Sequence, residues 1–316
     1  MTETVVIAQS TKNKAFNIKI LKFLETFYKK FLSGCRASPA IIKLMKLKDF
    51  LEAEKIFEYS ILPFSEAEII DERRASRLFS DVECQTVVPF LIPYLVRSGE
   101  DSNISVYAHA RDYHFYFKAL SERLKETFGD VVSACDTSPI NEVACAVRAG
   151  LGSIGKNGLI INRRYGSYAF VAEAFFSLPI DHPLFEGIER KDKGHFCLEC
   201  GACERACPTS ALSDKSRCVS FINQKKRLDE GDEEIIVKSG SVWGCDVCQS
   251  VCPMNESAEE TEISFFKEER TPYITLELLD KMIRDDSFST RAYAWRGEAV
   301  IRRNAELCQK SKNALQ

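Results

Sequence analysis

The sequence predicts an α/β (α+β) fold: a domain with a mixed sheet and flanking helices, joined to a small cysteine-rich domain. Three observations lead to this prediction. Apolar runs typical of buried strands occupy residues 86–95 and 168–176. Stretches with one apolar face, typical of helices that pack on a sheet, precede and separate these runs. Eight of the 13 cysteines then lie between Cys197 and Cys252.

Length, charge and hydropathy limit the class of protein. The 316 residues, 45% of them hydrophobic, suffice for one large domain or two ordinary ones. The formal net charge of −3 gives no overall basic surface for nucleic acid. No apolar run reaches the length of a membrane span, and MTETVVIAQS at the N-terminus contains neither a signal peptide nor a twin-arginine segment. We therefore expect a cytoplasmic protein without membrane contact.

The first predicted elements are helices. Residues Phe16–Leu32 place apolar side chains on one face and lysines largely off it. Such a helix docks on the protein's own core or lies on a membrane surface, and we favour the first. A second helix is expected over Ala40–Phe57, and a third follows a polar start within Tyr107–Phe128. The apolar stripe of the third helix consists of Tyr113, Tyr116, Phe117, Leu120 and Leu124.

The two apolar runs predict the main strands. Thr86–Leu95 is apolar on both faces and suits a buried strand, although Pro89 and Pro93 push it toward a sheet edge or an irregular path. The second strand is Tyr168–Phe176. Glu173 is the only charge inside it and lies either on a solvent face or in a buried polar contact.

Asp136 follows a short predicted strand, DVVSAC. The next residues, Ser138 and Pro139, predict a helix start with serine as the cap and proline in the first turn. A carboxylate between a strand end and a helix start is either a reactive group or a helix-capping group. From the residues alone, the capping interpretation is favoured.

A glycine-rich loop, GLGSIGKNG, follows that helix. It matches G-x-G-x-x-G and nearly matches a phosphate loop, but Asn157 replaces the hydroxyl residue that would hold Mg²⁺. Nucleotide loops run from a strand to a helix, whereas here a helix precedes the loop and the β-like segment Leu159–Asn162 follows. We therefore expect no nucleotide site. The glycines allow close approach to a flat or bulky ligand, and Lys156 meets an anionic group or is solvated.

The cysteines form two runs that predict a ferredoxin-like domain with two [4Fe–4S] clusters. CLECGACERACP has the bacterial C-x2-C-x2-C-x3-C-P pattern, in which the fourth cysteine ligates the other cluster. CDVCQSVCP has only three cysteines, so Cys218 completes the eight thiolates. We assign one cluster to Cys197, Cys200, Cys203 and Cys252, and the other to Cys207, Cys218, Cys245 and Cys248.

Two other uses of cysteine fit less well. Zinc sites use four ligands in paired C-x2-C spacing, whereas the first run has a third and a fourth cysteine. Disulfides require an oxidising compartment, which nothing in the sequence indicates. We therefore expect the chain to divide into residues 1–190, a cluster domain at 191–260, and C-terminal helices at 261–316 that pack back on the core. The last of these helices is locally basic, so it is either a phosphate-binding patch or a solvated face.

Four blocks of the sequence together resemble the epoxyqueuosine reductases. These blocks are YAHARDYH, DTSPINEVACAVRAGLGSIGKNGLIINRRYGSYAFVAEAF, CLECGACERACPTSALSDKSRCVSFI and SVWGCDVCQSVCPMN. Their order and spacing match the family from Tyr107 to Asn255, and WRGEAVIRRNAEL is similar to the closing helix of the family. The cysteine blocks alone are not specific, but the DTSP and glycine block followed by those cysteines is.

The resemblance implies an activity. Members of the family are cobalamin-dependent enzymes with two [4Fe–4S] clusters that remove the epoxide oxygen of epoxyqueuosine in tRNA to give queuosine. It implies that residues 1–190 bind the corrinoid, that Asp136 is the proton donor, and that Gly152, Gly155, Lys156 and Asn157 lie against the corrin or its side chains. An external low-potential donor would supply the electrons. Opening an epoxide leaves an alkoxide that must be protonated, which agrees with an acid at Asp136.

The sequence departs from the family pattern in several places. His109 and Ala110 occupy the third and fourth positions of the YARGRDYH block, Ser153 stands where tryptophan is frequent, and Met254 follows the second C-P. The first hundred residues match poorly, and the C-terminal helical repeats of some members are missing, so we expect a divergent short paralogue. Two alternatives stay open: a corrinoid iron–sulfur reductase with another small substrate, and a two-cluster electron carrier without corrinoid.

Overall fold

The computed structural model describes residues 45–80, 82–99 and 101–314, with side chains described up to residue 310. Residues Lys46–Gln316 form one compact unit. The predicted helix at Phe16–Leu32 and the start of the one at Ala40–Phe57 lie outside the described residues. The described part of the second helix is α3, Leu47–Ala53, which ends earlier than predicted because Lys55 adopts a left-handed backbone with φ 64°.

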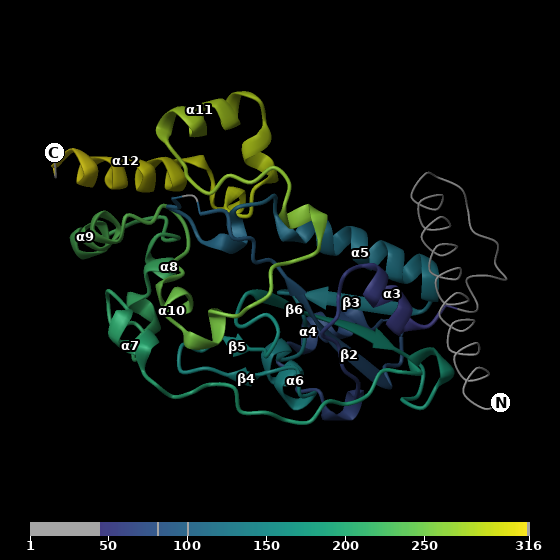
Figure 1. The fold of residues 1–316 in the computed structure, drawn as a ribbon. Helices are drawn as coiled ribbons and strands as arrows, with labels where there is room; N and C mark the ends of the chain where they lie inside the picture. The colour runs from purple at the N-terminus through teal and green to yellow at the C-terminus, as the bar shows by residue number, and fades with distance from the viewer. Residues whose placement is uncertain (1–44, 81, 100, 315–316) are drawn as a thin grey trace, which may run out of the picture. The chain divides into compact units, whose positions relative to one another are not determined.

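A four-stranded sheet with the order β1-β2-β6-β3 organises the unit (Figure 1). Its strands are β1 at Leu62–Pro63, β2 at Thr86–Pro93, β3 at Val131–Cys135 and β6 at Ala169–Phe176. Each of these strand pairs is antiparallel. The α/β class is thus confirmed, but this sheet is antiparallel instead of mixed. Apolar periodicity predicts a strand and carries no information about its direction.

Strand β2 is an inner strand, so the edge position suggested by its prolines is wrong. It pairs with β6 along its whole length. On its other side β1 spans two residues, and beyond them only an isolated bridge joins Tyr59 to Phe90. Pro89 has no N–H to donate, but its carbonyl accepts from the Ser60 N–H at 3.0 Å. The prolines are tolerated because the neighbouring strand is this short.

Two helices cover opposite faces of the sheet (Figure 1). On α5, Tyr113–Phe128, the ring of Tyr113 stacks on Phe170 of β6 with centroids 4.0 Å apart. On the other face, α6 at Glu142–Arg148 shares a core with Val171 and Phe175 of β6. Alternate residues of a strand point to opposite faces, which accounts for this division. The predicted stripe of α5 is buried except for Phe117, which is half-buried.

The remaining elements are α4 and those that build the glycine-loop hairpin, the cysteine region and the C-terminal part. Their α-helices and strands are α4 (Glu72–Leu78), β4 (Ser153–Ile154), β5 (Ile160–Ile161), α7 (Ala202–Ala206), α8 (Val219–Ile222), α9 (Glu230–Ser239), α10 (Val247–Ser250), α11 (Leu276–Arg284) and α12 (Glu298–Ala314). Short 3-10 turns lie at Phe64–Glu66, Val106–Ala108, Pro183–Phe185, Lys215–Arg217, Pro253–Asn255, Ser264–Phe266, Ser287–Thr290 and Ala294–Arg296. Helices α9, α11 and α12 enclose a second core around Trp243 and Tyr293.

The two predicted C-terminal helices are confirmed as α11 and α12 (Figure 1). Within the described ranges, no helix combines the length and the apolar character that crossing a membrane requires. The predicted division at residues 190 and 260 stays a prediction.

Candidate functional site

Four cysteines from both runs surround one small pocket. Its lining includes Cys197, Cys200 and Cys203 of the first run and Cys252 of the second. The two runs meet because the short helices α7 and α10 pack against each other. Gly201, with φ 70°, allows the backbone to turn between Cys200 and Cys203. The grouping is the one that the spacing predicts for the first cluster.

The other four cysteines form a second group. Burial is the main cause that raises the pKa of Cys245 to about 11 and that of Cys248 to about 12, and in both cases Cys207 and Cys218 add to the shift. These four thiols are therefore close enough to interact electrostatically. A bound metal centre lowers the pKa of its cysteine ligands instead, because thiols must lose their protons to become ligands.

The donor set fits iron–sulfur clusters better than zinc or disulfides. All eight cysteines are free thiols. In the part of the chain that the structure describes, no three Cys, His, Asp or Glu side chains converge closely enough to hold a single metal ion. A cubane spaces its ligands around a polynuclear core, so two open groups of four thiols suit it. The individual ligand assignments stay predictions.

The glycine loop is packed against the protein's own backbone. A Cβ on Gly150 would lie 2.2 Å from the Lys191 carbonyl oxygen, and one on Gly152 would lie 2.6 Å from that of Ile161. A Cβ on Gly155 would lie 2.7 Å from Oδ1 of Asn157. These approaches explain the glycines without a ligand, while their predicted role toward a corrin stays a prediction.

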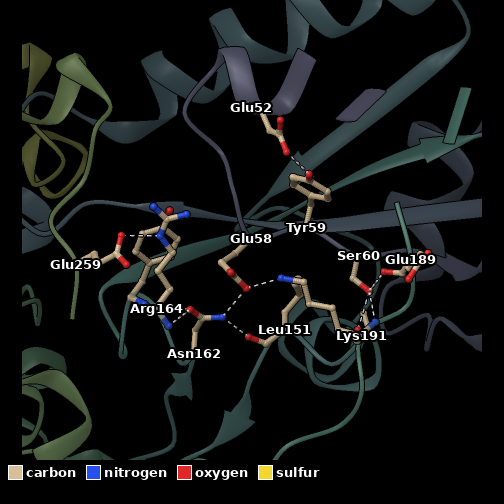
Figure 2. A network of polar contacts seen from close by, with 12 residues as sticks. Glu52, Glu58, Tyr59, Ser60, Leu151, Asn162, Arg164, Glu189, Lys191 and Glu259 are labelled. Carbon is tan, nitrogen blue, oxygen red and sulfur yellow. Dashed lines mark hydrogen bonds and ion pairs between the residues drawn. The ribbon is translucent and has the colours of Figure 1, made fainter. Parts of the chain in front are cut away.

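Polar contacts hold this loop in place (Figure 2). Nδ2 of Asn162 donates to the Leu151 carbonyl at 2.6 Å and to the Glu58 carboxylate at 3.0 Å. Nζ of Lys191 reaches the same carboxylate at 2.7 Å. The loop leaves α6 and enters the β4–β5 hairpin, so a helix precedes it and a strand follows, as predicted. This order does not aim a helix N-terminus at a phosphate.

Lys156 and Asn157 lie with the first cysteine group, because both line its pocket. Nζ of Lys156 forms an ion pair with Glu204 of α7 at 3.2 Å. The exposed Lys156 ammonium therefore contacts the cluster loop. The contact of Lys156 and Asn157 with corrin side chains stays a prediction.

Asp136 stands directly after β3, as predicted, and its side chain is exposed. Its backbone is left-handed, with φ 59°, a conformation that aspartate tolerates better than most residues. The hydroxyl of Tyr113 donates a hydrogen bond to Oδ2 of Asp136. Burial, followed by the Asp136 carboxylate, raises the pKa of Tyr113 above its usual range, so the hydroxyl keeps its proton.

The helix after Asp136 begins later than predicted. Asn141 is its cap and accepts a hydrogen bond from the Ala144 N–H at 3.1 Å, whereas Ser138 and Pro139 lie outside the helix. The Pro139 carbonyl instead accepts from the N–H groups of residues 70 and 71, which pairs this segment with another part of the chain. This long-range pairing is invisible in the local sequence. Asp136 is therefore not the cap of α6.

Sequence analysis missed the residues that surround Asp136. Tyr113 was identified only as part of an apolar stripe, although YAHARDYH is one of the family-like blocks. Glu142 was not singled out. Glu173 is fully buried, so of the two alternatives for this residue the solvent face is excluded. The sequence feature that indicates a special role for Glu173 is its position as the only charge in an apolar strand.

An open cavity of about 420 Å³ lies between the sheet and the second cysteine run. Its lining includes Leu95, Val106 and Tyr168 on one side and Ser250 and Asn255 on the other. Arg97, His109 and Glu256 also line the cavity, so apolar, hydroxyl, amide and charged groups together border it. The residue after Val106, Tyr107, contacts the Tyr113 ring, which links this wall to Asp136.

The basic C-terminal stretch is largely bonded to the protein itself. Arg291 donates to the Glu269 carbonyl, Arg296 to the Gln224 carbonyl and Arg303 to the Lys225 carbonyl, all within 3.0 Å. Arg302 pairs with Asp280 at 2.6 Å. These arginines therefore have structural partners, which weakens the prediction of a phosphate-binding patch.

Comparison with known proteins agrees with this geometry. Residues 196–255 match the family model of a 4Fe–4S double cluster binding domain. The epoxyqueuosine reductase of Leadbetterella byssophila is 34% identical over 189 residues, which cover 55% of this chain and 60% of that protein. The epoxyqueuosine reductase of Synechocystis sp. is 35% identical over 233 residues, which cover 66% of this chain and 77% of that protein. The one of Lactococcus garvieae is 31% identical over 263 residues, which cover 74% of this chain and 71% of that protein.

Solved structures share the fold. The epoxyqueuosine reductase of Streptococcus thermophilus superposes with a TM-score of 0.64 at 23% identity, covering 84% of this chain and 80% of that one. An epoxyqueuosine reductase with a tRNA-Tyr epoxyqueuosine-modified stem loop superposes with a TM-score of 0.63 at 22% identity, covering 82% and 79%.

The cysteine geometry and the family model together define the chain as a protein that carries a 4Fe–4S double-cluster domain. More particularly, it belongs to the epoxyqueuosine reductase family. The match spans 60% and 58% of the length of the relatives from Leadbetterella byssophila and Cyclobacterium marinum.

Proposed function

We propose that this protein removes the epoxide oxygen of epoxyqueuosine in tRNA and so produces queuosine. The observation that carries the proposal is the placement of Asp136: an exposed acid directly after β3, hydrogen-bonded by Tyr113, in a chain that also brings eight thiols into two groups of four. Family membership supports the same reaction.

Cysteines from both runs hold two [4Fe–4S] clusters in this proposal: Cys197, Cys200, Cys203 and Cys252 the first, Cys207, Cys218, Cys245 and Cys248 the second. In this proposal the open cavity beside Tyr168 and Asn255 accommodates part of a cobalamin, and Gly152, Gly155, Lys156 and Asn157 lie against the corrin or its side chains. Bound cobalamin would supply low-potential electron transfer to the substrate carbon. The protein's own residues position the substrate and move protons.

Asp136 delivers a proton to the oxygen that leaves the opened ring. The Tyr113 hydroxyl donates to Oδ2 and so fixes the orientation of the Asp136 carboxyl group. The stacked rings of Tyr113 and Phe170 fix that hydroxyl against the sheet.

A queuosine-type anticodon loop is the expected RNA partner, and an external low-potential protein the expected electron donor. The solved relative with a modified tRNA stem loop supports the first expectation. The net charge is −3, and the C-terminal arginines bind other groups of the protein. RNA binding must therefore depend on local contacts instead of an overall positive charge. The corrinoid-binding, cluster and C-terminal parts would correspond to residues 1–190, 191–260 and 261–316.

The test is turnover by the reconstituted protein. The chain is purified without oxygen, loaded with iron, sulfide and hydroxocobalamin, and incubated with a chemical reductant and an anticodon stem-loop RNA that contains epoxyqueuosine. Mass spectrometry of the digested nucleosides measures queuosine. Matched preparations are Asp136→Asn and the wild-type protein without hydroxocobalamin.

We expect queuosine from the complete wild-type protein and from neither matched preparation. Corrinoid retained after desalting without queuosine formation would favour a reductase with another substrate. Two clusters with no retained corrinoid would overturn the proposal in favour of an electron carrier.

A further inference from the structure

A tryptophan side chain is exposed on the surface just before α12. Trp295, in the 3-10 turn Ala294–Arg296, exposes 64% of its surface, whereas the other tryptophan of the chain, Trp243, is buried. Burial of an indole ring contributes strongly to a core, so a tryptophan left this exposed forgoes much stability. Single exposed apolar residues are nevertheless common on protein surfaces, so exposure alone assigns no role to Trp295.

The contacts of Trp295 hold its ring in place and leave one face open. Cζ of Arg296 lies over the ring, 4.5 Å from its centroid. The Trp243 ring meets the indole at an interplanar angle of 83°, with centroids 6.2 Å apart. Arg296 is itself fixed, because its Nε donates to the Gln224 carbonyl at 2.6 Å. Among the described residues no other ring or cation contacts this indole, so the face opposite Arg296 can receive a flat partner.

The segment to which Arg296 binds is basic and contains a second exposed ring. Residues 214–227, DKSRCVSFINQKKR, include five lysines and arginines and a single aspartate. Phe221 exposes 55% of its surface within this segment. Arg303 of α12 donates to the carbonyls of Lys225 and Lys226 at 2.9 Å and 3.2 Å. The end of the basic segment therefore lies beside Trp295 and the start of α12.

Two cations at the end of this segment can bind an anionic partner. Lys226 and Arg227 are exposed, and neither forms an ion pair with another described residue. The first acids that follow them already have partners within the protein, because Asp229 caps α9 and Asp232 pairs with Lys225 at 2.7 Å. Surfaces that bind single-stranded nucleic acid combine such cations, which contact phosphates, with aromatic rings on which bases stack.

A chain of contacts joins Trp295 to the proposed acid. Trp295 meets the ring of Trp243, whose Nε1 donates to the Tyr107 hydroxyl at 2.7 Å. The Tyr107 ring contacts the Tyr113 ring with centroids 6.4 Å apart, and Tyr113 donates a hydrogen bond to Asp136. Only three residues therefore separate the exposed indole from Asp136. An RNA loop whose modified nucleoside meets Asp136 can thus place another of its bases at Trp295.

We propose that Trp295 is a stacking platform for an unpaired base of the RNA loop, and that Lys226 and Arg227 contact the phosphates beside it. This inference rests on the proposed function and names the part of the surface that recognises the RNA. Trp295 does not touch the reacting atoms, so it is a positioning residue. The exposed Glu230 and Glu298 follow the cations and the ring along the chain, which confines the positive charge to this segment. Recognition by stacking selects a loop, because the bases of a paired stem are not free to stack on a side chain.

The test measures RNA binding separately from turnover. Protein loaded with both clusters and hydroxocobalamin is titrated without oxygen against two radiolabelled probes: an anticodon stem loop without epoxyqueuosine, and a fully paired RNA duplex of the same length. Filter binding gives the Kd of each complex. Trp295→Ala removes the ring, Trp295→Phe keeps an aromatic ring, and Ile180→Ala is the matched control, because Ile180 is an exposed apolar residue after β6. Iron and corrinoid content are checked for each variant.

We expect Trp295→Ala to bind the stem loop about tenfold more weakly than the wild type and to bind the duplex equally well, as the loss of one stacked base predicts. Trp295→Phe should recover most of this loss, and Ile180→Ala should match the wild type. In single-turnover reactions with the epoxyqueuosine-containing stem loop, Trp295→Ala should raise the half-saturating RNA concentration by the same factor and leave the rate at saturation unchanged.

The cations are tested by the salt dependence of binding. Lys226→Gln and Arg227→Gln should each weaken binding to the stem loop and reduce the slope of log Kd against log salt concentration by about 0.7, the value for one phosphate contact on a single strand. Trp295→Ala should leave this slope unchanged. Slopes equal to that of the wild type in both Gln variants would remove the two cations from the inference.

Three results would overturn the platform: no binding of the stem loop by the wild type, equal stem-loop affinity of Trp295→Ala and wild type, or an equal loss of affinity for both probes, which would indicate a structural effect. Self-association that depends on Trp295, with RNA affinity unchanged, would assign the surface to a second copy of the chain. If loop binding depends on Trp295 but the wild type makes no queuosine, the proposed function fails and the platform stands. Turnover that is undiminished in Trp295→Ala at limiting RNA refutes only the platform.

Discussion

Glu142→Gln should remove a pH dependence from the stability of the folded protein. Folding raises the pKa of Glu142 from 4.5 to about 7, mainly through burial. The folded protein therefore keeps a proton that the unfolded chain releases between those two pH values. The stability from this group is fully present below pH 4.5 and is lost as the pH rises to about 7. At about 1.4 kcal/mol per pH unit the full shift is worth about 3 kcal/mol, and partial exposure reduces the expected effect to about 2 kcal/mol.

The assay is thermal unfolding of wild type, Glu142→Gln and the control Glu122→Gln, at an exposed position of α5, at pH 5 and pH 8, without oxygen and at one scan rate. A change of about 2 kcal/mol corresponds to a shift of roughly 4–8 °C for a chain of this size. We expect Glu142→Gln to gain this much relative to wild type on going from pH 5 to pH 8, and the control to gain nothing. Parallel pH dependence of all three proteins would refute the argument that burial holds a proton on Glu142.

Other changes test the acid, the clusters and the glycine loop. Asp136→Asn should retain iron and corrinoid but lose at least about 100-fold in single-turnover rate, as loss of a general acid does; near-normal turnover would remove the acid role. Cys218→Ala should lower bound iron from about eight to about four atoms per chain, and unchanged iron would exclude it as a ligand. Gly150→Ala should unfold far more readily than Gly129→Ala: both glycines have positive φ, but only at Gly150 would a Cβ meet backbone, at 2.2 Å from the Lys191 carbonyl oxygen. Equal stability of the two variants in denaturant titrations would contradict that close approach.

Local sequence patterns predicted the elements well. The apolar runs became β2 and β6, DVVSAC became β3, and Asp136 came directly after it. Cysteine spacing predicted which thiols of the two runs come together around the first pocket. Each of these features depends on residues that are near neighbours along the chain or on a spacing rule.

What failed depends on contacts between distant segments. Strand direction in the sheet is set by pairing, and β2 is an inner strand because β1 and β6 pair with its two edges. The start of α6 moved to Glu142 because Pro139 pairs with residues near 70. The hydrogen bond from Tyr113 to Asp136 joins separate elements. The apolar periodicity of a single element cannot predict these contacts between distant segments.

The sharing of thiols between the two cysteine runs determines when the clusters can be built during synthesis. With the grouping described above, the first cluster needs Cys252 in addition to the three cysteines that end at Cys203. With the proposed ligand sets, synthesis must therefore pass Cys248 before the second cluster has all four ligands, and Cys252 before the first cluster does. Translation that stops before Cys245 would then yield a protein with neither cluster complete, so we expect iron loading late in synthesis.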